Sequence, residues 1–201
     1  MKIKLYHGDI DENINLGSII GIDTETMGLN PIRDKLCLVQ LSNGNGICHL
    51  IKINNNTKPI NLIKILKNKN ILKIFHFARF DVAILKHTYK INVKNIYCTK
   101  IASKIVRTYT EKHGYKDLCN ELINETISKT EQSSDWGGDL NKKQLEYAAT
   151  DVLYLHKIKE KLDKMLEREG RTKLAKSCFN FIEQRTDLDL QGWIDIDIFK
   201  H

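Results

Sequence analysis

Two carboxylates follow an apolar run near the start of the chain. The run, residues 19–22, is rich in isoleucine and typical of a buried strand, and it leads directly into Asp23 and Glu25. Because alternate side chains of an extended chain point to the same face, these two carboxylates project together and Thr24 points the other way. Neighbouring carboxylates repel one another unless a cation lies between them, and Mg²⁺ and Mn²⁺ bind carboxylate oxygens. The pair predicts half of a divalent-metal site, although an isolated Asp-x-Glu triplet is more often a solvated turn.

Three residues further along the chain could complete such a site. Asp81 lies near the start of a predicted helix that directly follows a strand. Tyr147 and Asp151 are four residues apart in another predicted helix, so they share one face, which is offset from the apolar stripe and looks into a cleft. Each has a simpler interpretation, because the helix dipole favours Asp81 near a helix start and the other pair could be half exposed. Their order and contexts together favour a site.

Four carboxylates and a tyrosine fit the hydrolysis of a phosphodiester bond. Two divalent cations about 3.5–4 Å apart can hold the attacking water and the leaving oxygen on opposite sides of the phosphorus. A tyrosine hydroxyl beside them can orient that water, but a phenol with an ordinary pKa of about 10 is a poor base at neutral pH. We therefore expect Tyr147 to orient the water first, with little direct proton transfer.

The strand over residues 18–26 is followed by a hairpin. Residues 36–41 and 47–51 are apolar runs separated by an Asn-Gly-Asn-Gly turn over residues 43–46, and both residue types tolerate the positive φ that hairpin turns need. These runs predict a meander of three strands. The segment from Lys2 to Leu16 adds one short strand and a turn.

Strand and helix patterns alternate through the middle of the chain, which predicts an α/β layer architecture. Asn141 and Gln144 have the spacing of a capping box, and Thr99 stands where a helix N-cap could. The predicted elements are a helix over residues 60–67, a strand over 71–75, a helix after His76–Arg79, a strand over 95–98, helices over 101–106 and 114–122, a polar loop over 128–138, one long helix from Asn141 to a stop at Gly170, a helix over 172–185 and an extended tail over 188–199.

Length and composition narrow the function classes. A chain of 201 residues is long enough for one core and predicts one domain, and the formal net charge of +7 favours a polyanionic partner. No apolar stretch approaches the ~20 residues that span a bilayer, and the N-terminus lacks the apolar core of a signal peptide, so we expect a cytoplasmic protein with no membrane partner. The five cysteines form no Cys-x-x-Cys pair, which predicts reduced, mostly buried thiols.

Three motifs carry a resemblance to a known family. Asp23-Thr24-Glu25, the segment from His76 to Asp81 and the segment from Tyr147 to Asp151 match, in order and spacing, the exonuclease motifs of the DEDDy 3′-to-5′ exonucleases. The chain resembles ribonuclease D and, within that group, the small single-domain NanoRNase C family of bacteria. Supporting stretches are Cys98–Lys104, Gln132–Trp136 and Leu188–Trp193.

The resemblance implies an RNase H-like α/β fold, with a mixed central β-sheet flanked by helices, in one exonuclease domain over residues 1–201. It implies two Mg²⁺ or Mn²⁺ ions and removal of nucleoside 5′-monophosphates from the 3′ ends of very short RNAs, especially diribonucleotides. It also implies ring-like homo-oligomers, for which the C-terminal helix and tail, residues 172–201, are the expected contact. The implied metal ligands are Asp23, Glu25, Asp81 and Asp151, and Tyr147 would position the attacking water.

The resemblance also implies substrate contacts. Leu29 would be a wedge between the last two bases, although it could be an ordinary loop leucine. His76 and Phe77 would contact the terminal nucleotide, although Phe77 could belong to the core. Thr24, between the first two acids, is also expected to contact the substrate. A 5′-phosphate would be held by Lys100 and by Gln132, Ser133 and Ser134, which lie in the loop over residues 128–138 that closes that end of the site.

Other functions remain open at this stage. A ribonuclease D-like trimmer of longer RNA 3′ ends or a DNA 3′-to-5′ exonuclease would need the same metals and the same motifs. Processive work on structured RNA is not expected, because the segment after Asp151 is too short for the helical nucleic-acid-binding domains of full-length ribonuclease D. A binding module that has lost catalysis is disfavoured, because all five catalytic positions are present.

Overall fold

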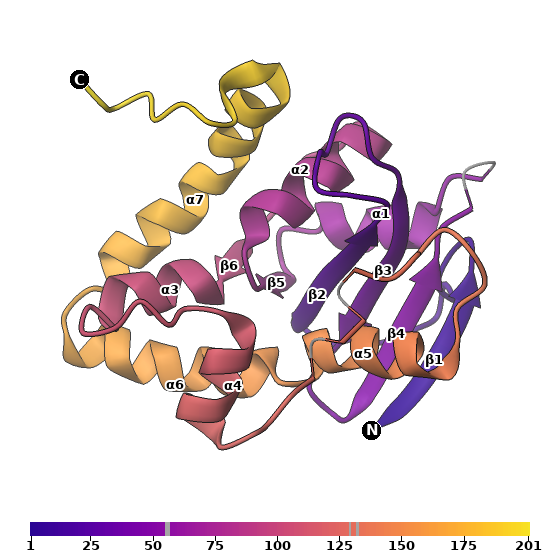
Figure 1. Ribbon diagram of the computed structural model, residues 1–201, viewed down its shortest axis with the longest axis horizontal. Helices are drawn as coiled ribbons and strands as arrows, with labels where there is room; N and C mark the ends of the chain where they lie inside the picture. Colours follow the sequence, from indigo (N-terminus) through magenta and orange to yellow (C-terminus); the bar gives the residue numbers. More distant parts are fainter. Residues whose placement is uncertain (55–56, 129, 132) are drawn as a thin grey trace.

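The computed structural model describes residues 1–54, 57–128, 130–131 and 133–201. Within this part of the chain, six strands form one sheet in the order β1-β4-β3-β2-β5-β6 (Figure 1). The strands are β1 (Lys2–His7), β2 (Ile19–Thr26), β3 (Leu36–Ser42), β4 (Ile47–Lys52), β5 (Leu72–Phe75) and β6 (Ile96–Cys98). The predicted mixed sheet is confirmed.

The meander of β2, β3 and β4 is antiparallel, as the hairpin signal predicts. Gly44 and Gly46 adopt φ values of 81° and 84° in the turn between β3 and β4, a conformation that glycine allows at little cost. The register places Asp23 directly opposite Gln40 of β3. The other three pairings are parallel: β1 with β4, β5 with β2 and β6 with β5.

Helices cover both faces of the sheet. In Figure 1, α5 (Lys142–Leu153) crosses one face in front, and α1 (Ile60–Lys67) and α2 (Ala78–Tyr89) lie behind the sheet. The end of β2 is therefore placed between α5 and α2. The remaining helices gather beyond β6 and are α3 (Thr99–Val106), α4 (Tyr115–Ile123), α6 (Leu155–Arg168) and α7 (Thr172–Leu188). The predicted α/β architecture is confirmed, and the core is formed by the apolar faces of β2 to β5 and of the helices against them.

The prediction of one long helix from Asn141 to Gly170 is wrong. The helix breaks at Tyr154, between α5 and α6. The hydroxyl of Tyr115 accepts a hydrogen bond from the Tyr154 backbone N–H at 3.3 Å and donates one to the Thr150 carbonyl at 2.9 Å. In a continuous helix these two backbone groups would bond to each other, so the Tyr115 hydroxyl replaces one backbone hydrogen bond of the helix and bends it.

Two further predictions need correction. Thr99 is the first residue of α3 and not its cap, because its hydroxyl donates to the Phe75 carbonyl of the neighbouring strand at 3.1 Å. The tail from Leu188 is not extended throughout: α7 continues to Leu188 and is followed by a π-helical turn over Asp189–Trp193. Asp189 is buried there between two arginines, which holds the chain in the turn.

The remaining composition-based predictions can be checked against the described residues. All five cysteines are free, four of them buried and Cys178 half-buried, as predicted. Among the helices of the described residues, none is both long and apolar enough to cross a bilayer.

Candidate active site

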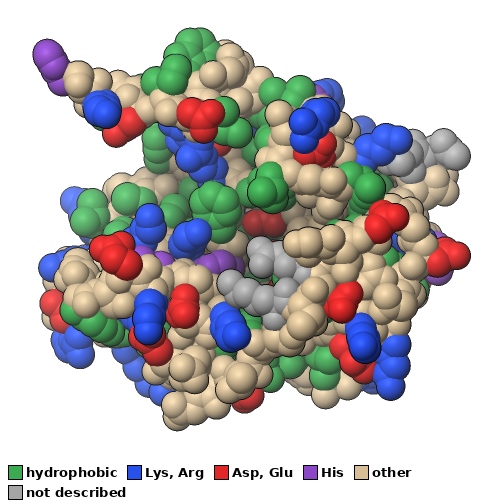
Figure 2. Space-filling view, viewed as in Figure 1, with side chains coloured by type: hydrophobic (Ala, Val, Ile, Leu, Met, Phe, Trp, Pro, Cys, Tyr) green, Lys and Arg blue, Asp and Glu red, His purple; other side chains and the backbone are tan. Residues whose placement is uncertain are grey.

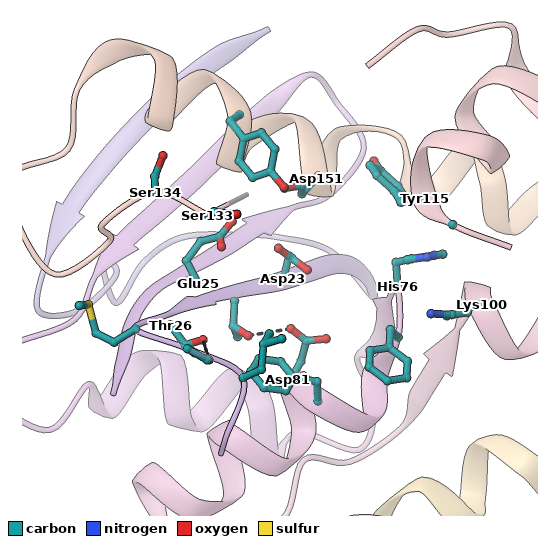
Figure 3. Close-up of a pocket in the computed structure, with 18 of the residues that line it drawn as sticks. Asp23, Glu25, Thr26, His76, Asp81, Lys100, Tyr115, Ser133, Ser134 and Asp151 are labelled. Carbon is teal, nitrogen blue, oxygen red and sulfur yellow. Dashed lines mark hydrogen bonds between the residues drawn. The ribbon is translucent and has the colours of Figure 1, made fainter. Parts of the chain in front are cut away.

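A cavity of about 540 Å³ opens at the end of β2. Figure 3 shows β2 in the middle, with α5 on one side and α2 on the other. With one exception, every residue predicted for the site lines this cavity; the exception, Gln132, lies outside the described residues. The predicted residues found there are Asp23, Thr24, Glu25, Leu29, His76, Phe77, Asp81, Lys100, Ser133, Ser134, Tyr147 and Asp151.

Three carboxylates meet on the side of β2 that faces α5. Asp23, Glu25 and Asp151 each offer an oxygen, and these oxygens all lie within 4.8 Å of one another. The strand contributes two of them because residues two apart in a strand point to the same side. Asp151 reaches them from α5 (Figure 3).

The fourth carboxylate lies on the other side of β2. The Thr24 hydroxyl donates a hydrogen bond to Asp81 Oδ1 at 2.7 Å, and both residues are buried. Thr24 therefore points away from its two acidic neighbours, as the strand pattern predicts. Its hydroxyl is used to hold Asp81, which comes from the first turn of α2.

Burial makes these carboxylates hard to ionise without a cation. Burial raises the pKa of Asp23 to about 7. Burial, followed by the negative charges of Asp23 and Asp151, raises the pKa of Glu25 to about 10. Burial and the Asp23 charge likewise raise the pKa of Asp81 well above its ordinary value. A hard divalent cation fits this set, because it is bound by carboxylate oxygens and neutralises their repulsion.

Tyr147 lies on the same face of α5 as Asp151, one turn earlier. Burial, then the Asp151 charge, raise the pKa of Tyr147 above its ordinary value, and its hydroxyl is hydrogen-bonded to the Asp151 carboxylate. The ring centroid lies 6.0 Å from that of the buried Trp136. A phenol with a raised pKa stays protonated at neutral pH, so Tyr147 can orient a water molecule but is not suited to remove its proton.

Sequence reasoning missed Gln40, a positioning contact beneath the acids. Its Nε2 donates to Glu25 Oε1 at 3.3 Å, and the side chain is fully buried. Its Oε1 has no hydrogen-bond partner among the residues that the structure describes. A polar residue inside the apolar run of residues 36–41 was a signal that could have identified it.

Sequence reasoning also missed Tyr115. Its ring lines the cavity, with its centroid 5.5 Å from that of the His76 ring. Its hydroxyl is the group that breaks the helix between α5 and α6. Nothing in the local sequence marks it, because its partners lie more than thirty residues away.

Lys100 lies on the opposite side of the acids from the loop that carries Ser133 and Ser134 (the serine loop). In Figure 3, Lys100 and His76 are on one side of Asp23, and Ser133 and Ser134 are on the other. Lys100 Nζ lies 4.3 Å above the centroid of the Phe77 ring, which is half exposed and not part of the core. These positions do not place Lys100 and the serines around one phosphate group.

One hydroxyl of the serine loop is already hydrogen-bonded to a carboxylate. Ser134 Oγ donates to Glu131 Oε2 at 2.6 Å. A phosphate beside Ser134 would be repelled by this carboxylate. Leu29, in contrast, is 84% exposed at the edge of the cavity, in the loop between β2 and β3, where it is accessible to a ligand.

Two comparisons of the sequence identify relatives. Residues 9–167 match the family model described as 3′-5′ exonuclease. Ribonuclease D of Gluconacetobacter diazotrophicus is 30% identical over 164 residues, which cover 80% of this chain and 41% of that protein. Ribonuclease D of Bartonella henselae is 29% identical, over 85% of this chain and 43% of that protein. The chain thus spans less than half the length of the curated relatives it matches.

Solved structures of NrnC match the whole chain. The structure of Brucella melitensis NrnC with bound Mg²⁺ is 50% identical with a TM-score of 0.95, and the match covers 100% of both chains. The same protein bound to pGG matches with a TM-score of 0.96 over 100% of this chain and 99% of that one. Escherichia coli RNase D is 26% identical, with a TM-score of 0.74 over 84% of this chain and 45% of that one.

These matches also identify the mixed sheet and its helices as the RNase H-like exonuclease fold. The chain therefore belongs to the 3′-5′ exonuclease family, as a ribonuclease D-like member of the NrnC type.

Proposed function

We propose that this protein is a metal-dependent 3′-to-5′ exoribonuclease that degrades very short RNAs, especially diribonucleotides, to nucleoside 5′-monophosphates. The observation that carries the proposal is the convergence of Asp23, Glu25, Asp151, Asp81 and Tyr147 in one cavity at the end of β2. The relatives support it, since all those named above are exonucleases of the ribonuclease D or NrnC type.

The four carboxylates would hold two divalent cations, Mg²⁺ or Mn²⁺. When bound, such cations neutralise the charge of the phosphodiester and lower the pKa of the attacking water. Asp23, Glu25 and Asp151 supply oxygens from one side of β2, and Asp81 supplies its carboxylate from α2, where Thr24 fixes its rotamer. Gln40 fixes Glu25 in the same way from β3.

Tyr147 has the task of orienting water. Its hydroxyl lies in the cavity beside Asp151 and keeps its proton, so it can hold the attacking water in line with the bond to be broken. Burial of the ring against Trp136 restricts its rotation. The product that leaves is a nucleoside 5′-monophosphate, and the shortened RNA keeps a 3′-hydroxyl.

The walls of the cavity supply contacts for a short substrate. Leu29 would separate the two bases, and Phe77 would stack on one of them, with His76 beside the terminal nucleotide. Lys100 would meet a 5′-phosphate, and Ser133, on the other side of the acids, would contact the other nucleotide. The Brucella NrnC structure with pGG supports a dinucleotide as the ligand.

We also propose that the protein assembles into a ring-like homo-oligomer through its C-terminal helix and tail. The tail exposes apolar side chains at Trp193, Ile194, Ile196, Ile198 and Phe199. Exposed apolar groups of this kind mark contact surfaces. Replacing Ile196, Ile198 and Phe199 by Ser should lower the mass found by light scattering, and an unchanged mass would refute this contact.

Substrate length is the decisive measurement. The experiment is a time course with 5′-labelled RNAs that range from a dinucleotide to a heptanucleotide, with Mg²⁺ or Mn²⁺, for the wild type and Asp23→Ala. We expect the dinucleotide to disappear fastest and the variant to be inactive. Equal shortening of all lengths would instead favour a trimmer of longer RNA, which the ribonuclease D relatives support as the second candidate. Matched DNA oligonucleotides test the third candidate, a DNA exonuclease.

A further inference from the structure

A buried acid lies outside the catalytic cavity, at the end of α7. Asp189 is 4% exposed and accepts hydrogen bonds from two guanidinium groups. Arg79 donates to it through Nε at 2.6 Å and Nη2 at 2.7 Å, and Arg185 donates through Nε at 3.0 Å and Nη2 at 2.6 Å. Paired, two-point contacts of this kind fix the direction of the groups as well as their distance.

Arg79 connects this acid to the active site. It is the second residue of α2, and the same first turn carries Asp81. The helix starts without a side-chain cap, directly after Phe77, which has a left-handed backbone conformation with φ 67°. No side-chain cap therefore orients the start of this turn, and Figure 1 shows the end of α7 beside α2.

The two arginines also hold the chain after Asp189. Arg79 Nη2 donates to the Ile194 carbonyl, and Arg185 donates to the carbonyls of Trp193 and Ile196. Gly192, with φ 105°, lets the chain turn back toward the arginines. The C-terminal turn, residues 189–196, is thus bound to the start of α2 and not only to α7.

We propose that Asp189 is a positioning residue for the reaction, because it fixes the first turn of α2 through Arg79. The metal ligand Asp81 and the nucleotide-contacting Phe77 take their places from that turn. The inference rests on the proposed function for its activity readout, but cation binding tests it independently. A change at Asp189 would shift Asp81 and so affect both cation binding and catalysis, since a displacement of about 1 Å at a reacting centre can cost roughly a hundredfold in rate.

The chain offers a matched control at the other end of the same interface. Lys86, in the last turn of α2, forms an ion pair with Asp187 of α7 at 2.5 Å. This pair also joins α2 to α7, but it lies away from the first turn of α2. If Asp189 had only a structural role, Asp189→Asn would lower the melting temperature but, like Asp187→Asn, would leave the Mn²⁺ affinity and kcat of the folded protein unchanged.

A second cavity lies on this side of the molecule. Hydrophobic and basic side chains lie side by side on the face shown in Figure 2. The second cavity, of about 470 Å³, is lined by both Arg79 and Arg185 and shares Phe77 and Lys100 with the catalytic cavity. Movement of Arg79 would therefore also reshape the second cavity, which adjoins the catalytic cavity at Phe77 and Lys100.

The test compares Asp189→Asn, Asp187→Asn and Arg79→Lys with the wild type. The dissociation constant of Mn²⁺ is measured from the free-ion signal in electron paramagnetic resonance, kcat and KM are measured on a dinucleotide, and the melting temperature is measured in EDTA. We expect Asp189→Asn to weaken Mn²⁺ binding and to lower kcat by about tenfold or more each, the size seen when residues behind metal ligands are changed. Asp187→Asn should change neither by more than about twofold.

Arg79→Lys keeps the charge but loses the two-point contact, so it should show the same losses that we expect of Asp189→Asn. It therefore tests the proposal even if Asp189→Asn does not fold. The proposal would be overturned if Asp189→Asn or Arg79→Lys kept the wild-type Mn²⁺ affinity and kcat, or if Asp187→Asn showed the same losses. A wild-type protein that binds Mn²⁺ but releases no nucleotide would contradict the proposed function, and the Mn²⁺ comparison would still decide the role of Asp189.

Discussion

Thr24 Oγ1 lies 2.7 Å from Asp81 Oδ1, and this hydrogen bond joins the strand that carries Asp23 and Glu25 to the helix that carries the fourth acid. Replacing Thr24 by Val keeps the shape and removes the donor. We expect a metal affinity about tenfold weaker, because residues behind metal ligands typically change affinity by 10- to 100-fold. Titration with Mg²⁺ at saturating substrate measures it.

Thr24→Ser is the matched control for that variant. It keeps the hydroxyl and should restore most of the wild-type affinity. If Val and Ser behave alike, the hydroxyl is not what holds Asp81.

The stability of the metal-free protein should fall as the pH rises. Asp23 has a pKa raised from 3.8 to about 7, and Glu25 has one raised from 4.5 to about 10. Between the ordinary and the raised values the folded protein holds protons that the unfolded chain has lost, so stability decreases by about 1.4 kcal/mol per pH unit for each such proton. The stability is fully present below about pH 4 and is lost as the pH rises through about 7 for Asp23.

Magnesium should reverse this loss, because it replaces the protons. Melting temperatures in EDTA and in Mg²⁺, at about pH 5.5 and about pH 8.5, should differ more at the higher pH. The Asp23→Asn variant should show a flatter pH dependence in EDTA. The same magnesium effect at both pH values would mean that the acids are ionised in the metal-free protein.

Tyr147→Phe should lower kcat by about a hundredfold and leave Mn²⁺ binding unchanged, because the proposed task of the hydroxyl is to orient water and not to bind the metal. Single-turnover rates on a dinucleotide measure this. Tyr154→Phe is the control, since its hydroxyl bonds to Glu125 at 3.3 Å and Tyr154 does not line the catalytic cavity. A large loss of Mn²⁺ affinity in Tyr147→Phe would assign the residue a different role.

Lys100→Gln should reduce kcat/KM about tenfold for a 5′-phosphorylated dinucleotide and much less for one with a 5′-hydroxyl, because one charged contact of about 1.5–3 kcal/mol is lost. Ser133→Ala should affect both substrates equally, since it lies on the other side of the acids (Figure 3). The reverse pattern would place the phosphate at the serine loop.

Gly28→Ala should impair cleavage of the dinucleotide without weakening Mn²⁺ binding. A Cβ at Gly28 would lie 2.3 Å from Asp34 Oδ2, and Asp34 is held by Arg33 and by the Asn30 backbone, so the loop that carries Leu29 must shift. Gly138→Ala is the control, because its nearest contact would be 3.8 Å away. Similar kinetics of the two variants would show that the position of Leu29 does not matter.

Local rules were sufficient for much of the fold. The meander followed from apolar runs and an Asn-Gly turn, and the Asn141 capping box is present, with Gln144 N–H bonded to Asn141 Oδ1 at 3.0 Å. Two pairs in the site also followed from local periods: Asp23 and Glu25, two residues apart in a strand, and Tyr147 and Asp151, four apart in a helix.

Contacts between distant segments explain what sequence reasoning missed. The break at Tyr154 depends on Tyr115, which comes from α4, and the turn at Asp189 depends on Arg79, more than a hundred residues earlier. Gln40 lies at the site because the pairing of β2 with β3 places it directly opposite Asp23. Periodicity within one segment contains no information about such partners, so the long helix and the extended tail were predicted wrongly.

The two edges of the sheet have a consequence for aggregation. At one edge, β1 is mostly exposed, with only Ile3 and Tyr6 half-buried, and it carries Lys2 and Lys4. Lysines on an edge strand disfavour pairing with a strand of another molecule, because their charges would be desolvated. At the other edge, β6 is only three residues long, and its Tyr97 is covered by Phe179 of α7, with ring centroids 4.6 Å apart. Neither edge is a good template for strand addition, so the protein should resist fibre formation even at high concentration.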